Sequence, residues 1–95
     1  MYHRSFLDEL SKTTSQLQKM IDKGREQQMI NMEIFDTLLI LVNEIKVLVH
    51  ENQPIPFELV KKWNNFYGKI FRAFEGSDIE ISLDKITEII NLKKN

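Results

Sequence analysis

The chain has 95 residues, of which 42% are hydrophobic and 28% charged, and its formal net charge is −1. This size predicts a single domain over residues 1–95, with too much apolar material for a disordered chain. The near-neutral charge disfavours nucleic acid as a partner, and the absence of cysteine excludes disulfides, thiolate metal sites and a cysteine nucleophile.

The first predicted helix covers residues 6–23. Ser5 is a candidate N-cap, because its hydroxyl can accept an otherwise unpaired backbone amide of the first turn. Gly24 is expected to end the helix in the left-handed conformation, and residues 24–31 fit either a loop or a helix. Thr13 and Thr14 interrupt the apolar stripe, which otherwise consists of Phe6, Leu10, Leu17, Met20 and Ile21.

A second helix carries an apolar stripe from Ile34 to Val49, with Asn31 as a candidate cap. Ile40 and Val47 fall on roughly the opposite side, so this helix is apolar nearly all round, which is typical of the central helix of a bundle. The pattern favours an arrangement in which another helix or long side-chain stems cover these two residues. The alternative is an exposed apolar strip that binds a partner.

A hinge follows, because Gln53 and Ile55 each precede a proline and are biased away from the helical conformation. The third predicted helix spans residues 56–75 and ends at Gly76. Gly68 in its middle costs about 1 kcal/mol relative to alanine, and we expect close approach of a neighbouring helix or ring to explain it. The helix is aromatic, and we assign most of these rings to the core, with Phe66 and Phe71 at its margin: Phe57, Trp63, Phe66, Tyr67, Phe71 and Phe74.

The fourth predicted helix covers residues 83–92, with Ser82 as N-cap and Ile81 packed on Ile86 as a hydrophobic staple. Residues 79–81 are expected to form an extended lead-in. Core-facing positions are Leu83, Ile86, Ile89 and Ile90. Four amphipathic helices with short connections predict an all-α fold, an antiparallel up-down four-helix bundle. The nearest alternative is a three-helix core with a loosely attached fourth helix.

Catalytic chemistry has little support in the sequence. The two histidines are His3, near the terminus, and His50, at the end of the second helix, where a cation complements the helix dipole. The inward positions of the helices are aliphatic, so no metal, cofactor, small-molecule substrate or catalytic residue is predicted, and we expect a protein that is not an enzyme. Asp8 and Glu9 interrupt the N-terminal segment, and no apolar run approaches the ~20 residues of a membrane-spanning helix.

The second to fourth predicted helices resemble the immunity proteins that protect Gram-positive bacteria against class IIa (pediocin-like) bacteriocins. The resemblance covers roughly residues 34–92. It rests on the helix start at residues 34–39 (IFDTLL), the hinge Pro54-Ile55-Pro56, the helix at residues 57–67 (FELVKKWNNFY) and the segment at residues 81–90 (ISLDKITEII).

The resemblance implies a non-enzymatic, cytoplasmic protein that engages the bacteriocin-occupied membrane permease and blocks the pore, with peripheral membrane association left open. Exposure and position then point to six partner-binding residues in the C-terminal half: Lys61, Lys69, Arg72, Lys85, Lys93 and Lys94. The alternative function is a small helical adaptor, secretion chaperone or regulator that acts through protein contacts. The sequence leaves its oligomeric state open, and a homo-oligomer would fit this alternative.

Overall fold

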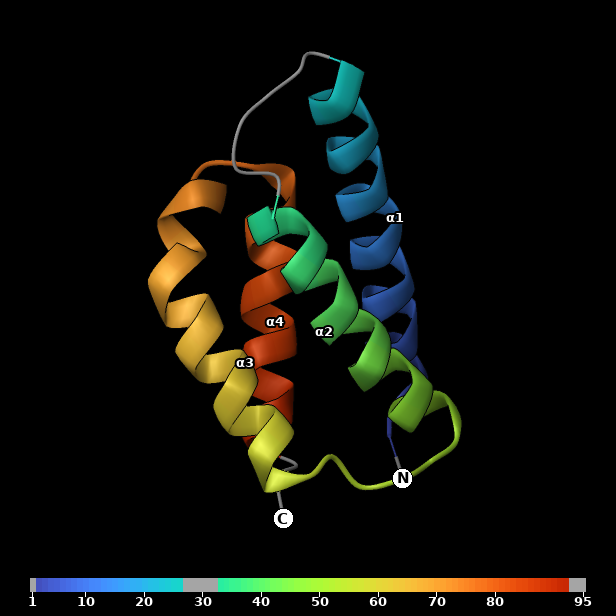
Figure 1. The fold of residues 1–95 in the computed structure, drawn as a ribbon. Helices are drawn as coiled ribbons and strands as arrows, with labels where there is room; N and C mark the ends of the chain where they lie inside the picture. Colours follow the sequence, from blue (N-terminus) through green and yellow to red (C-terminus); the bar gives the residue numbers. More distant parts are fainter. Residues whose placement is uncertain (1, 27–32, 93–95) are drawn as a thin grey trace.

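The computed structural model describes residues 2–26 and 33–92, and these residues form a four-helix bundle with up-down connectivity (Figure 1). The prediction of an all-α four-helix bundle is therefore confirmed. Helix α4 packs against both α1 and α3, so the alternative with a loosely attached fourth helix is wrong. The elements are α1 (Arg4–Glu26), α2 (Glu33–His50), α3 (Phe57–Ile70), the 3-10 helix η1 (Phe71–Phe74) and α4 (Asp78–Leu92).

The core forms because each helix places apolar residues three and four positions apart on one face. Trp63 and Phe74 are fully buried at its centre, and the four core-facing residues predicted for α4 are buried or half-buried. Thr13 is also fully buried, in line with the leucines of α1. Its hydroxyl donates to the carbonyl of Glu9 at 2.8 Å, so burial leaves this group satisfied.

Both predicted ends of α1 are wrong. The helix begins at Arg4, so Ser5 lies inside its first turn, and Nδ1 of His3 accepts the Ser5 amide at 3.2 Å in place of a serine cap. Gly24 lies inside the helix, which continues to Glu26. The loss of about 1 kcal/mol for a helical glycine is smaller than the gain from burying one aliphatic side chain such as Ile21. Asn31 lies outside the described residues.

Helix α2 ends in a left-handed turn at Asn52, whose φ is 57°. The amide of Gln53 donates to the carbonyl of Leu48 at 2.8 Å, and the amide of Asn52 donates to Val49 at 3.1 Å. These two bonds form a Schellman motif that satisfies the last carbonyls of the helix. Ile55 is then fully buried, so the hinge between α2 and α3 is anchored in the core.

The third helix is shorter than predicted. It ends at Ile70, and the chain tightens into η1 before Gly76, whose φ of 80° confirms that glycine as a terminator. The explanation expected for Gly68 is wrong, because a Cβ added there would meet nothing within 4 Å.

The fourth helix begins at Asp78, five residues earlier than predicted. Ser82 is buried inside it, and Ile81 is 65% exposed, so neither the cap nor the staple forms as expected. Ser77 and Glu80 have the spacing of a capping box. Glu80 accepts the amide of Gly76, one residue before the usual target. Residues 79–81 are therefore helical and not extended.

Gly68 and Gly76 give two stability predictions of opposite sign. Gly68→Ala should raise the free energy of unfolding by about 0.5–1 kcal/mol, because the helical site is exposed and open. Gly76→Ala should lower it by about 1 kcal/mol, because an alanine Cβ is strained at positive φ. Urea unfolding followed by circular dichroism measures both, and equal effects of the two substitutions would contradict this account.

Candidate functional site

Helices α3 and α4 are joined by three pairs of hydrogen-bonded side chains. Trp63 Nε1 donates to Thr87 Oγ1 at 2.8 Å, and the Tyr67 hydroxyl donates to Asp84 Oδ1 at 2.6 Å. The side-chain amides of Asn64 and Asn91 exchange hydrogen bonds at 2.9 and 3.0 Å. Tyr67, the last of these residues on α3, pairs with Asp84, the first of them on α4, as expected for antiparallel helices. We call the three pairs the α3–α4 ladder.

The ladder makes Tyr67 an unusual phenol. Its side chain is 9% exposed, and burial, together with the hydrogen bond to Asp84, raises the pKa of Tyr67 well above the ordinary value of 10.0. Both causes disfavour the phenolate, since burial removes solvating water and the carboxyl group needs the phenolic proton as a donor.

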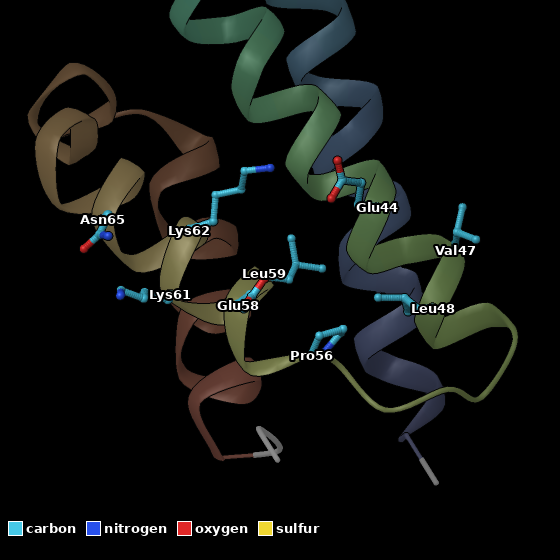
Figure 2. Close-up of a pocket in the computed structure, with 9 residues that line it drawn as sticks. All are labelled: Glu44, Val47, Leu48, Pro56, Glu58, Leu59, Lys61, Lys62 and Asn65. Carbon is cyan, nitrogen blue, oxygen red and sulfur yellow. The ribbon is translucent and has the colours of Figure 1, made fainter.

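A groove opens between α2 and α3 (Figure 2). The backbone of α2 approaches α1 closely, and α3 approaches α4, but α2 and α3 are not among the closely packed pairs of helices in the described chain. Their separation leaves a groove of about 730 Å³. It is lined by Glu44, Val47, Leu48, Pro56, Glu58, Leu59, Lys61, Lys62 and Asn65.

The groove has an apolar floor and a charged mouth. Leu48 on α2 and Leu59 on α3 point toward each other across the floor (Figure 2). Glu44 and Lys62 extend toward the opening from opposite walls (Figure 2). Both charged side chains are exposed, and neither has a hydrogen-bond or ion-pair partner within residues 2–26 and 33–92. Such a surface can bind an amphipathic ligand, because it offers apolar contact and, with Glu58 and Lys61 of the α3 wall, exposed charges of both signs.

Ile40 and Val47 are exposed beside this groove, at 58% and 54%. The favoured prediction, that another helix covers them, is therefore wrong. They share one face of α2 with Glu44, since positions four and seven residues apart are neighbours on a helix. The opposite side of α2 carries its core residues, and α1 packs closely against the helix, so nothing in the described chain covers this face.

The aromatic residues of α3 and η1 divide between the core and the surface, where Phe57 is 55% exposed. Trp63 and Phe74 are fully buried, and Phe35 of α2 packs edge-on against Phe74 with ring centroids 5.5 Å apart. These rings are unavailable for stacking on nucleic-acid bases. Phe66 is half-buried against the core, whereas Phe71 is 45% exposed and lies 5.9 Å from the Arg72 guanidinium.

The predicted partner-binding residues do not gather in one place. Lys61 lines the groove, next to Lys62, which the sequence analysis omitted. Lys69 is exposed eight residues further along, about 12 Å down the helix axis. Arg72 and Lys85 are exposed on η1 and α4 and do not line the groove. Lys93 and Lys94 lie outside the described residues.

Periodicity could not have identified Lys62, because what distinguishes it from Lys61 is the direction of its side chain, which extends across the groove toward Glu44 (Figure 2). No group of three or more potential metal ligands occurs in the described part of the chain, and none of the described helices combines the length and apolarity that crossing a membrane requires. No family model matches the chain, and neither the curated proteins nor the solved structures include a match.

The α3–α4 ladder predicts energetic coupling between its members. Tyr67→Phe and Asp84→Ala should each destabilise the fold, and their double-mutant cycle should give a coupling free energy of about 1 kcal/mol, because each removes the same hydrogen bond. Glu88→Ala, an exposed residue of α4 outside the ladder, is the matched control and should be additive with Tyr67→Phe. If the effects of Tyr67→Phe and Asp84→Ala on the free energy of unfolding are additive, the hydrogen bond between the two residues contributes nothing to stability.

Tyr67 also predicts an alkaline loss of stability. Above pH ~10 the unfolded chain loses the phenolic proton while folded Tyr67 retains it. The unfolded state then binds fewer protons, so the free energy of unfolding falls as pH rises. Below pH 10.0, the ordinary pKa of tyrosine, Tyr67 makes its full contribution to the free energy of unfolding. Urea unfolding at several pH values should show a shallower alkaline decline for Tyr67→Phe than for the wild type. Identical slopes would contradict the raised pKa.

Proposed function

We propose that this chain is a non-catalytic protein that acts by binding other proteins, and specifically a cytoplasmic bacteriocin immunity protein. In this proposal it protects the producer cell by engaging the membrane permease that the bacteriocin occupies. The observation that carries the proposal is the hinge Pro54-Ile55-Pro56. The buried Ile55 of this hinge anchors α2 and α3 on either side of an open groove. The order of the helices around the hinge is the order on which the resemblance rests.

The exposed basic residues support a contact with a partner. Lys61, Lys69, Arg72 and Lys85 are all exposed, and they have no ion-pair partner in the part of the chain that the structure describes. Free surface cations steer association with an acidic partner and give up little solvation when the complex forms at the interface rim. We propose these residues, with Lys93 and Lys94, as the partner-binding set.

A second candidate function is a small helical adaptor, secretion chaperone or regulator. The observation that favours it is the exposure of Ile40 and Val47 beside the groove. Exposed aliphatic side chains on one helix face are typical of surfaces that bind another protein. The two candidates differ in the partner and in the residues that contact it, and Lys61 at the groove is common to both surfaces.

The immunity proposal predicts survival of a sensitive strain. Expression of the chain in a strain sensitive to class IIa bacteriocins should protect it against at least one of a panel of pediocin-like peptides. The doubly reversed variant Lys61→Glu with Lys85→Glu should weaken protection by about tenfold in bacteriocin concentration, because two attractive contacts become repulsive. Lys12→Glu, an exposed position on α1 outside the proposed set, should leave protection unchanged.

The expression level and the circular dichroism spectrum of each variant provide the control for folding. Absence of protection against every peptide of the panel, with the folded chain present in the cells, would contradict immunity. If the Lys61→Glu, Lys85→Glu variant still protects the cells, these basic residues are not the partner-binding residues, and the immunity proposal itself stands.

A further inference from the structure

We infer that the groove between α2 and α3 docks a short amphipathic helix of a partner protein. The inference deepens the proposed function by naming the kind of segment that is bound. It rests on the protein-binding role of the chain and not on bacteriocin immunity. Three observations support it: the apolar floor, the size of the groove and the two free charges at its mouth.

The floor fits the apolar face of a helix. Leu48, Pro56 and Leu59 line it from both sides, and the α3 wall extends from Pro56 to Asn65. Ten residues of helix extend about 15 Å, which matches two to three turns of a guest helix. A guest of that length presents two or three apolar side chains at positions i, i+4 and i+7, the usual anchors of a helix bound in a groove.

The size of the groove favours a helical segment over a second copy of this chain. A stable interface between two globular proteins involves about 20–30 residues on each side and about 800 Å² per partner. The groove is lined by nine residues, and the exposed Ile40 beside it extends the apolar surface only slightly. A narrow guest can contact both walls at once, whereas a second folded bundle would contact mainly the rims.

The mouth specifies the charges of the guest. Glu44 lies on the α2 wall, and Glu58, Lys61 and Lys62 lie on the α3 wall, so the net charge is negative on the α2 wall and positive on the α3 wall. A guest with a basic residue on one flank and an acidic residue on the other can pair with both. A guest with two like-charged flanks pairs with one wall and is repelled by the other. Reversing the direction of a mixed guest exchanges its flanks, so the two charges also fix the direction in which the helix binds.

Three synthetic peptides of about 14 residues test this inference. They share leucines at helical spacing and differ in their flanks, which are mixed, all acidic or all basic. Each is titrated into the full-length protein labelled with ¹⁵N, and amide shifts report the site. The mixed peptide should bind about fivefold more tightly than the other two, with shifts concentrated around Leu48 and Leu59.

Charge reversal at the mouth of the groove should change which of the three peptides binds most tightly. With Glu58 and Lys61 also on the α3 wall, Glu44→Lys makes the net charge of both walls positive and should bind the all-acidic peptide most tightly. Lys62→Glu makes the net charge of both walls negative and should bind the all-basic peptide most tightly. Val47→Lys should weaken the mixed peptide about tenfold, because it places a charge at the lining of the groove. Ile81→Lys is the matched control, since Ile81 is similarly exposed but lies on α4 outside the groove. It should leave binding unchanged.

Several results would overturn the inference. They are equal affinity for the three peptides, shifts outside the groove, or no binding at millimolar peptide. Sedimentation equilibrium provides a further test. Self-association of the wild type that Val47→Lys abolishes would assign the groove to a second copy of the chain. Peptide binding without bacteriocin protection would reject immunity alone, whereas protection without peptide binding would reject the docking site alone.

Discussion

The arrangement of the bundle depends on the α3–α4 ladder. Apolar stripes alone allow neighbouring helices to slide and rotate, because burial is nearly proportional to area and has no direction. The indole of Trp63 and the phenol of Tyr67 are directional donors, and each finds its acceptor at one longitudinal position on α4. An unpaired buried donor costs about 1–3 kcal/mol, so other registers are penalised. The ladder thus holds α3 against α4 and leaves the space between α3 and α2 open.

Periodicity predicted most of the fold because helix cores repeat every three to four residues. It failed where two local signals competed. Ser82 resembled a helix cap, but the helix begins earlier, where the Glu80 carboxylate accepts the amide of Gly76, and the longer helix also buries Ile79. Gly24 resembled a terminator, but packing of α1 outweighed its weak helix propensity. Glycine at residue 76 was interpreted correctly, because positive φ is a constraint that few other residues satisfy.

The candidate site could not be predicted in the same way. Whether Ile40 is covered depends on how closely the other helices approach α2, which the residues of α2 alone do not specify. Sequence analysis correctly identified Ile40 and Val47 as surplus apolar residues and favoured the wrong environment for them. It also selected Lys61 without Lys62, although the two adjacent lysines differ only in how they lie relative to the open groove (Figure 2).

In the proposed role, the groove can bind a partner without a large loss of stability in the free protein. Filling it would require α3 to move from α4 toward α2, which would break the hydrogen bonds of Trp63 and Tyr67. Keeping it open leaves Leu48 half-buried at the groove, where a guest can bury it further. Burial of the apolar lining of the groove, which the folded chain does not achieve by itself, can therefore stabilise a complex with a partner. The same directional contacts that define the bundle preserve an apolar surface for a partner, with Glu44 and Lys62 beside it to select the guest.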